Sequence, residues 1–202
     1  MWLAGLLRLA LFSGMCMLTS CWAVMPSCRG RFNTYRLPML DTSVVFHPRT
    51  DGIYVCEEAN GIFSFRGDGQ VKYYPNMIAK IPKESFWGDP AIIIEHVKRF
   101  DALNRREFWG AYAMIGSVLR VQHFNYHQTE FCKRSVFEYF GTMENDSSFV
   151  ITSEIAYWFD KAPDTTRYRY RFYPTEFTPD DRRIWFENRR WYKRGLHPSR
   201  AR

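Results

Sequence analysis

The 202-residue chain lacks the motifs that identify several large protein classes. It contains no Gly-x-Ser-x-Gly and no His-Glu-x-x-His sequence, so the hydrolases that carry these motifs are not indicated. Its five cysteines form no Cys-x-x-Cys pair and no cluster with histidine at zinc spacing, which argues against a structural zinc site. Long apolar runs are also missing, and a multi-span membrane protein is therefore excluded.

Aromatic residues, in contrast, are abundant. The chain is 46% hydrophobic and 18% aromatic, with 17 Phe, 12 Tyr and 7 Trp. Disordered chains are poor in aromatic residues, so this composition predicts a packed core. Aromatic side chains favour strands, and the length suits one domain. The composition therefore predicts a single β-rich domain.

The first segment, Met1 to Cys21, is typical of an export signal. Arg8 is its only charge, and an apolar core follows at Leu9–Leu18. This core is shorter than the about 20 residues that a membrane-spanning helix needs. Extending it back to Trp2 would place Arg8 in the bilayer at a cost of about 2.5 kcal/mol or more. We therefore expect residues 1–20 to be a signal peptide.

The sequence Leu18-Thr19-Ser20-Cys21 resembles the lipobox of bacterial lipoproteins, with an aliphatic residue, two small residues and a cysteine. This resemblance implies cleavage after Ser20 and acylation of Cys21, which would anchor the chain to the outer membrane of a bacterial envelope. Residues 21–43 would then form a tether. Two alternatives remain open, namely ordinary cleavage after Ala23 and an uncleaved signal anchor.

Three cysteines follow Cys21, so at least one of them cannot pair within the chain. An exported protein permits a bridge between Cys56 and Cys132. A buried free thiol is the alternative for each of the three.

Beyond Thr50, apolar and polar residues alternate, and turn residues recur at short intervals. Asn60-Gly61, Gly67-Asp68-Gly69 and Gly116-Ser117 are typical hairpin turns. The predicted strands are Gly52–Glu58, Ile62–Arg66, Gln70–Tyr74, Phe108–Ile115, Val118–Asn125, Val136–Met143, Ser148–Glu154, Arg167–Phe172 and Ile184–Tyr192. Hairpins favour antiparallel neighbours, and closure into a barrel removes exposed edges. We therefore predict an all-β antiparallel meander that closes into a barrel over residues 44–192.

One segment interrupts this pattern. Asp89-Pro90 suits a helix N-cap and first helical residue, and Ile93, Val97 and Phe100 share one helical face. These features predict one inserted helix over residues 90–103. The three consecutive isoleucines at 92–94 could instead begin a strand.

The body of the chain resembles the lipocalin-like domains of small bacterial envelope lipoproteins, from about Thr50 to Tyr192. The resemblance rests on Gly52-Ile53-Tyr54, the Asn60-Gly61 hairpin, Trp109-Gly110-Ala111-Tyr112 and Phe172-Tyr173-Pro174-Thr175, together with a final strand carrying Trp191. It implies a lipocalin-like barrel. The chain departs from the lipocalin pattern at Tyr54, where lipocalins place a tryptophan after Gly-x.

Few residues suggest chemistry. His123, His127 and Glu130 could form a metal site, but we expect surface residues at a strand end and no metal. Glu57 and Glu58 would face opposite ways on a strand. Gly67-Asp68-Gly69 lacks the following helix of a phosphate loop. We expect no catalysis and no cofactor.

The C-terminal stretch from Arg182 to Arg202 holds eight basic residues and one acidic residue, an excess equal to the net charge of +7 for the whole chain. Interleaved aromatic residues make it similar to a nucleic-acid patch, but an export signal argues against nucleic acid as a partner. In the tail at 193–202, Lys193, Arg194, Arg200 and Arg202 could contact anionic lipid. For Trp185–Tyr192 we expect a final strand with buried aromatics and solvated arginines.

Two functions are therefore compatible with the sequence. The barrel could bind a small apolar ligand, or its own side chains could fill it and leave a structural or interaction module of the envelope. The bulky residues predicted to face inward fit both functions. They are Tyr54, Phe63, Phe65, Tyr112, Phe137, Tyr139, Phe149, Tyr170 and Phe172.

Overall fold

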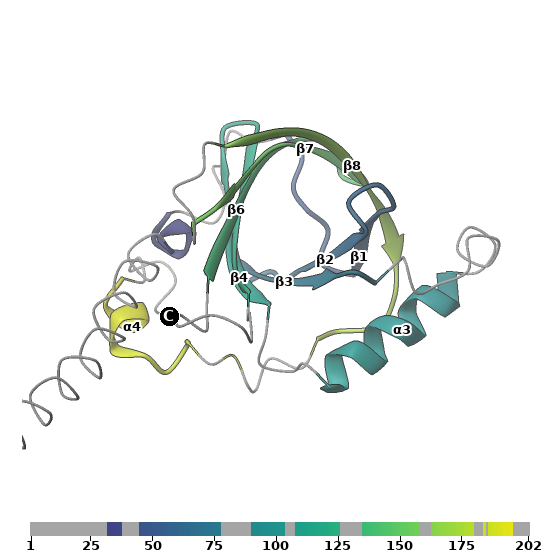
Figure 1. Cartoon of the computed structure of the whole chain (residues 1–202), viewed down its shortest axis with the longest axis horizontal. Coiled ribbons are helices and arrows are strands. Elements are labelled where there is room, and N and C mark those ends of the chain that lie inside the picture. Colours follow the sequence, from purple (N-terminus) through teal and green to yellow (C-terminus); the bar gives the residue numbers. More distant parts are fainter. Residues whose placement is uncertain are drawn as a thin grey trace, which may run out of the picture.

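The chain folds into a closed antiparallel β-barrel of eight strands (Figure 1). The structure, a computed structural model, describes residues 32–37, 45–77, 90–103, 108–125, 135–157, 163–179, 184 and 186–195. Each strand pairs with the next in sequence, and β1 pairs with β8 to close the ring. The strands are β1 (Gly52–Cys56), β2 (Gly61–Phe65), β3 (Gln70–Pro75), β4 (Trp109–Ile115), β5 (Val118–Asn125), β6 (Ser135–Asn145), β7 (Ser148–Ala156) and β8 (Asp164–Pro174). The predicted meander and its closure are confirmed.

Tight turns join most neighbouring strands where the sequence predicts them. Asn60, Gly69 and Gly116 have φ angles of 49°, 84° and 58°, in the left-handed region that asparagine and glycine tolerate best. The turn between β6 and β7 is shorter than the predicted four residues and consists of Asp146 and Ser147, because β6 extends to Asn145 while β7 begins at Ser148 as predicted. These turns give the barrel its simple up-and-down order.

The inserted helix α3 (Pro90–Leu103) has the predicted bounds and covers the outside of the barrel near β1, β2 and β3 (Figure 1). Its buried residues Ile93 and Val97 pack in one cluster with the outward-facing Ile53, Val55, Ile62 and Tyr74. Asp101 of α3 forms an ion pair with Lys72 of β3, whose side chain is 0% exposed. Because a buried charge needs a partner, this pair fixes the helix to one position on the sheet.

A second layer covers the outside of β4, β5 and β6. It combines η1 (Thr34–Arg36) with the segment before and within α4 (Arg190–Gly195), and Figure 1 shows these two distant parts of the chain on the same side of the barrel. Their aromatic residues form one buried cluster with the outer face of the strands, comprising Phe32, Tyr35, Trp109, Phe124, Phe186 and Tyr192. Gln122 accepts hydrogen bonds from the backbone N–H groups of Asn33 and Thr34 at 2.8 and 3.0 Å.

The ninth strand predicted at Ile184–Tyr192 is wrong. Backbone hydrogen bonds from Glu187 to Ile184 and from Arg189 to Phe186 form turns here, and a short helix follows. The pairing of β1 with β8 already closes the ring, so no strand edge is left for a further strand. The expectation that aromatic residues of this segment are buried holds for Phe186 and Tyr192, both packed on the outside of the barrel.

Several predicted features lie outside the described residues. They are the signal peptide at 1–20, the lipidated Cys21, most of the tether at 21–43, and Arg200 and Arg202 of the basic tail. Lys193 lies in α4 with an exposed side chain, and only the backbone of Arg194 is described. Within the described ranges, no helix is long and apolar enough to cross a membrane.

Candidate ligand site at one end of the barrel

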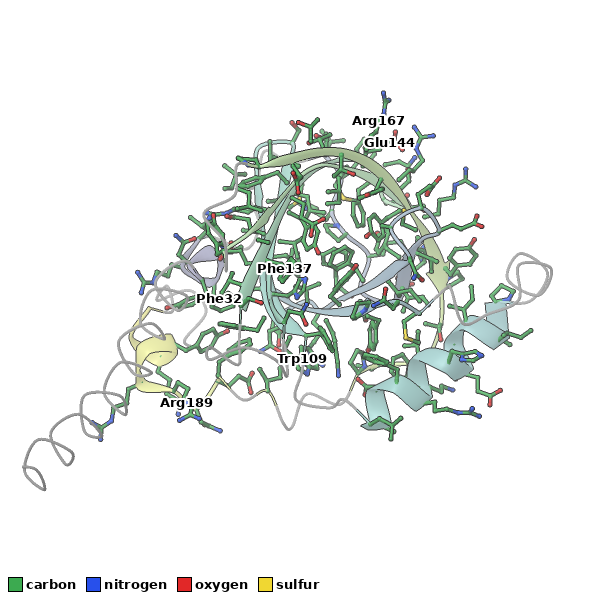
Figure 2. All side chains as sticks on the ribbon, in the orientation of Figure 1. Phe32, Trp109, Phe137, Glu144, Arg167 and Arg189 are labelled. Carbon is green, nitrogen blue, oxygen red and sulfur yellow. The ribbon has the colours of Figure 1, made fainter. Side chains whose placement is uncertain are left out.

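The two ends of the barrel interior differ in composition. The turns after β2, β4 and β6 lie at one end, which we call the aromatic end. Strands β1, β3, β5 and β7 finish at the other, which we call the polar end because Tyr73, His123, Tyr139 and Glu154 face inward there. All nine bulky residues predicted to face inward do so and belong to one interior cluster or pack against it. Side chains crowd the ring of strands in Figure 2, while Glu144 and Arg167 lie at its outer edge.

The aromatic end is filled by rings that meet across the barrel. Tyr54 and Phe65 make edge contact at 5.5 Å, and Phe65 contacts Phe149 at 5.8 Å. Phe63 of β2 reaches Tyr139 of β6, on the opposite side of the ring, at 5.7 Å. Tyr54, Phe63 and Phe149 are each 0% exposed. This part of the interior is therefore a packed core.

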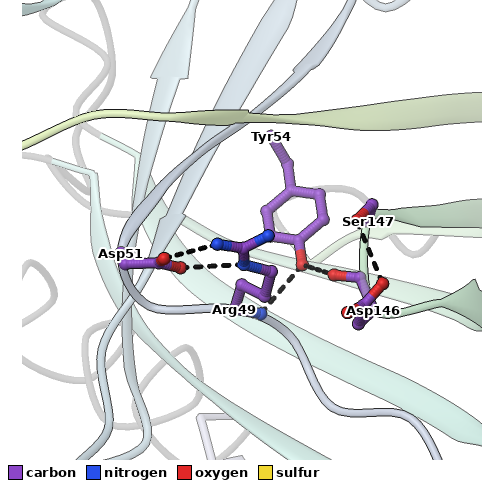
Figure 3. A network of polar contacts seen from close by, with 5 residues as sticks. All are labelled: Arg49, Asp51, Tyr54, Asp146 and Ser147. Carbon is purple, nitrogen blue, oxygen red and sulfur yellow. Dashed lines mark hydrogen bonds and ion pairs between the residues drawn. The ribbon is translucent and has the colours of Figure 1, made fainter.

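Arg49 and Tyr54 seal the aromatic end (Figure 3). The Tyr54 hydroxyl donates to the carbonyl of Asp146 at 2.6 Å and accepts from the Arg49 backbone N–H at 2.8 Å. The Arg49 guanidinium lies 4.2 Å from the Phe172 ring centroid and pairs with Asp51 through two bonds of 2.5 and 2.9 Å. Burial raises the pKa of Tyr54 to about 12. At the position where lipocalins carry tryptophan, this chain thus places a phenol that links β1 to the β6–β7 turn.

His123 forms part of the polar end, so its assignment to the surface was wrong. It is 1% exposed, and its ring is stacked with those of Phe137 and Tyr139, whose centroids lie 5.6 and 5.5 Å away. Its Nε2 lies 3.4 Å from the Tyr139 hydroxyl. Burial lowers the pKa of His123 to about 4, so the ring is neutral at pH 7. The register explains the position, because His123 pairs with the inward-facing Phe137.

Glu154 lies beside this stack. It pairs across the strands with Tyr139, so both side chains face inward. The ring of Tyr73 lies 5.9 Å from that of Tyr139, so two phenols gather near the carboxyl group. Burial, and after it the charge of Asp164, raise the pKa of Glu154 above its usual range. Burial also raises the pKa of Tyr73, Tyr139 and Tyr170, which stay protonated and can donate.

Inward-facing side chains of intermediate exposure gather at the polar end, whereas the inward-facing rings described at the aromatic end are buried except for that of Phe172. Five inward-facing residues keep an intermediate share of their surface exposed, namely Tyr73, Phe137, Glu154, Ala156 and Tyr168. Beneath them, His123, Tyr139 and Tyr170 are between 1% and 5% exposed. The polar end therefore presents an aromatic wall above a buried floor that carries hydrogen-bonding groups, which is the composition of small-molecule sites.

Cys56 also faces the interior and is a buried free thiol. Its Sγ donates to the Glu58 carboxylate at 3.1 Å, and burial raises its pKa to about 12, so it is a poor nucleophile. Cys132 lies outside the described residues, and the Cys56–Cys132 bridge stays a prediction. Glu57 and Glu58 lie in the turn after β1 and not on a strand.

The sequence predicted only part of this site. The inward aromatic residues were predicted from alternation. Tyr73 and Glu154 were not predicted, and His123 was assigned to the surface, although each stands at an inward position of an alternating segment. His127 and Glu130 lie outside the described residues. Within the described ranges, no group of three metal-binding side chains occurs.

Comparison with family models, with curated proteins and with solved structures found no match to this chain. The fold, an eight-stranded antiparallel closed barrel, is compatible with a lipocalin-like protein.

Proposed function

We propose that this chain is a non-catalytic envelope lipoprotein whose barrel binds a small, largely apolar ligand at its polar end. The observation that carries this proposal is that three inward-facing rings at this end, those of Tyr73, Phe137 and Tyr168, are only partly buried. A barrel that serves only as a scaffold gains stability by burying such aromatic rings completely. Rings left partly in contact with water forgo some of that stability, which a bound ligand covering them would restore.

The packed rings beneath the site favour a small ligand and leave no room for a long chain. Phe63, Tyr139 and Tyr170 close the barrel beneath the polar end, with Phe63 contacting Tyr170 at 5.0 Å and Tyr139 at 5.7 Å. A long chain could not pass this layer without displacing packed rings. The hydroxyls at the floor would orient a bound molecule by hydrogen bonds, while the rings above would supply contact area.

The test is titration of the full chain, solubilised in detergent, with the neutral fluorescent probe N-phenyl-1-naphthylamine. Ala156 faces inward opposite Phe137, so Ala156→Trp should fill the site and abolish binding. The neighbouring Ile155 pairs with the outward-facing Glu138, and Ile155→Trp is the matched control that should bind normally. Equal binding by the two variants would place the probe elsewhere and contradict the proposal.

The anchor is tested separately. Intact mass of the protein from its membrane fraction should reveal a chain that starts at Cys21 with added acyl mass. Cys21→Ala should release the protein in soluble form. An unmodified chain starting after Ala23 would contradict lipid anchoring without affecting the ligand proposal.

The second candidate function is a filled barrel that acts as a structural or interaction module of the envelope. The ring contacts across the barrel favour it, above all that of Phe63 with Tyr139. This candidate predicts that the wild-type protein retains no probe and that Ala156→Trp changes nothing but stability.

A further inference from the structure

We propose that the ligand of the polar end is an organic cation, either a quaternary ammonium or a protonated amine carried on an apolar group. This inference rests on the proposed function and names the chemical class of its ligand. Its basis is the juxtaposition of the Glu154 carboxyl with the rings of Tyr73, Tyr139 and Phe137 on the inner wall of the barrel.

The first argument is charge. Glu154 is partly buried and faces inward, opposite Tyr139 on the neighbouring strand. On the inward faces of the described strands no lysine or arginine occurs, because Lys72, Arg120 and the arginines of β8 all alternate outward. A carboxylate removed from water is costly unless a positive group accompanies it. A cationic ligand would supply the missing charge.

The same carboxyl group disfavours anionic ligands. Asp164 pairs with Glu154 across β7 and β8 and adds a second negative charge at the rim of the site. A fatty acid or other carboxylate entering here would face two like charges and no compensating cation on the described inner wall. The lipid-like ligands expected of an apolar barrel are therefore disfavoured when they carry a negative head group.

The second argument is the aromatic wall. The ring of Tyr73 lies 5.9 Å from that of Tyr139 and 4.7 Å from that of His123, and the Phe137 ring is stacked with His123 at 5.6 Å. Faces of phenol and phenyl rings attract cations, most strongly where water is excluded. The imidazole does not oppose this attraction, since His123 is neutral at pH 7. The site thus combines a carboxylate with aromatic rings, and both groups attract ammonium ions.

The test compares two probes of the same shape that differ in charge, choline and 3,3-dimethyl-1-butanol, by isothermal titration calorimetry of the detergent-solubilised full chain. Choline should bind at least about fivefold more tightly than the alcohol. Glu154→Gln keeps the size and a hydrogen-bonding oxygen but removes the charge, and should weaken choline binding about tenfold while leaving the alcohol unchanged. Glu144→Gln, on the outer edge of the barrel, is the control that should alter neither affinity.

The outcomes separate this inference from the proposed function. If N-phenyl-1-naphthylamine binds but choline shows no advantage over the alcohol, the site exists and the cation inference is overturned. The same conclusion follows if Glu154→Gln leaves choline affinity unchanged or weakens both probes equally. If the naphthylamine probe and choline both fail to bind wild-type protein, the proposed function itself has failed.

Discussion

The two ends of this barrel are built from the same strands with the same alternation, yet they differ in how completely their side chains are buried. At the aromatic end, Phe65, Phe149 and Tyr54 fill the interior, and none is more than 1% exposed. At the polar end, tyrosines, a histidine and a glutamate occupy the equivalent inward positions, and several remain accessible. One ring of strands therefore holds both a core that stabilises the fold and a surface suited to recognition.

The largest expected effect is a difference in stability between variants at the two ends of the barrel. Phe63→Ala removes a fully buried ring that contacts rings from β6, β7 and β8, and should lower the free energy of unfolding by about 3–5 kcal/mol. Phe137→Ala at the polar end should cost roughly 1–2 kcal/mol, because that ring already keeps part of its surface in water. Urea unfolding of both variants measures the difference. Equal losses would show that the two ends are equally packed.

The next effect is the pH dependence of stability that His123 introduces. Its folded pKa of about 4 lies below the unfolded value of 6.5, so the unfolded chain binds the extra proton first. Stability present above pH 6.5 should fall as the pH drops toward 4, by about 3 kcal/mol in total. His123→Phe, with a ring of similar shape, should lack this component. Unfolding of both proteins at several pH values tests this expectation, and parallel profiles would contradict it.

A smaller effect tests whether the aromatic end is independent of the ligand site. Tyr54→Phe keeps the ring but removes the hydroxyl that bonds Asp146 and Arg49, which should cost about 1–2 kcal/mol. Probe binding at the polar end should not change. A lower melting temperature with unaltered affinity is the expected result, and a parallel loss of affinity would mean that the two ends are coupled.

The smallest effect concerns Glu154 itself. Its pKa is raised in the folded state, chiefly by burial, so the folded chain binds the proton more tightly than the unfolded chain. This contribution to stability is present below the unfolded pKa and is lost as the pH rises through the folded pKa. Glu154→Gln should therefore be slightly more stable than wild type at pH 7, by less than about 1 kcal/mol. The gain should vanish at acidic pH, and thermal unfolding at both pH values provides the measurement.

Sequence reasoning predicted the meander and its inward aromatic residues because alternation and turn residues are local signals. The helix was predicted with its observed bounds for the same reason, since Asp89-Pro90 and the spacing of Ile93 and Val97 are local too. The strand predicted after Ile184 was wrong for a non-local reason. Such a strand needs a free edge to pair with, and the pairing of β1 with β8 leaves none. Likewise, nothing near His123 in the sequence shows that Phe137 lies opposite it.

The pairing of β1 with β8 has a consequence for how the chain folds. Most ladders form between neighbouring strands, but this one joins Gly52 to Pro174 and Val55 to Arg171 across most of the domain. The loop-closure entropy of that contact is the largest in the barrel, so we expect ring closure to limit the folding rate. Until β8 arrives, β1 and β7 keep open edges that could pair with other chains. We therefore expect association between chains to compete with folding until the ring closes.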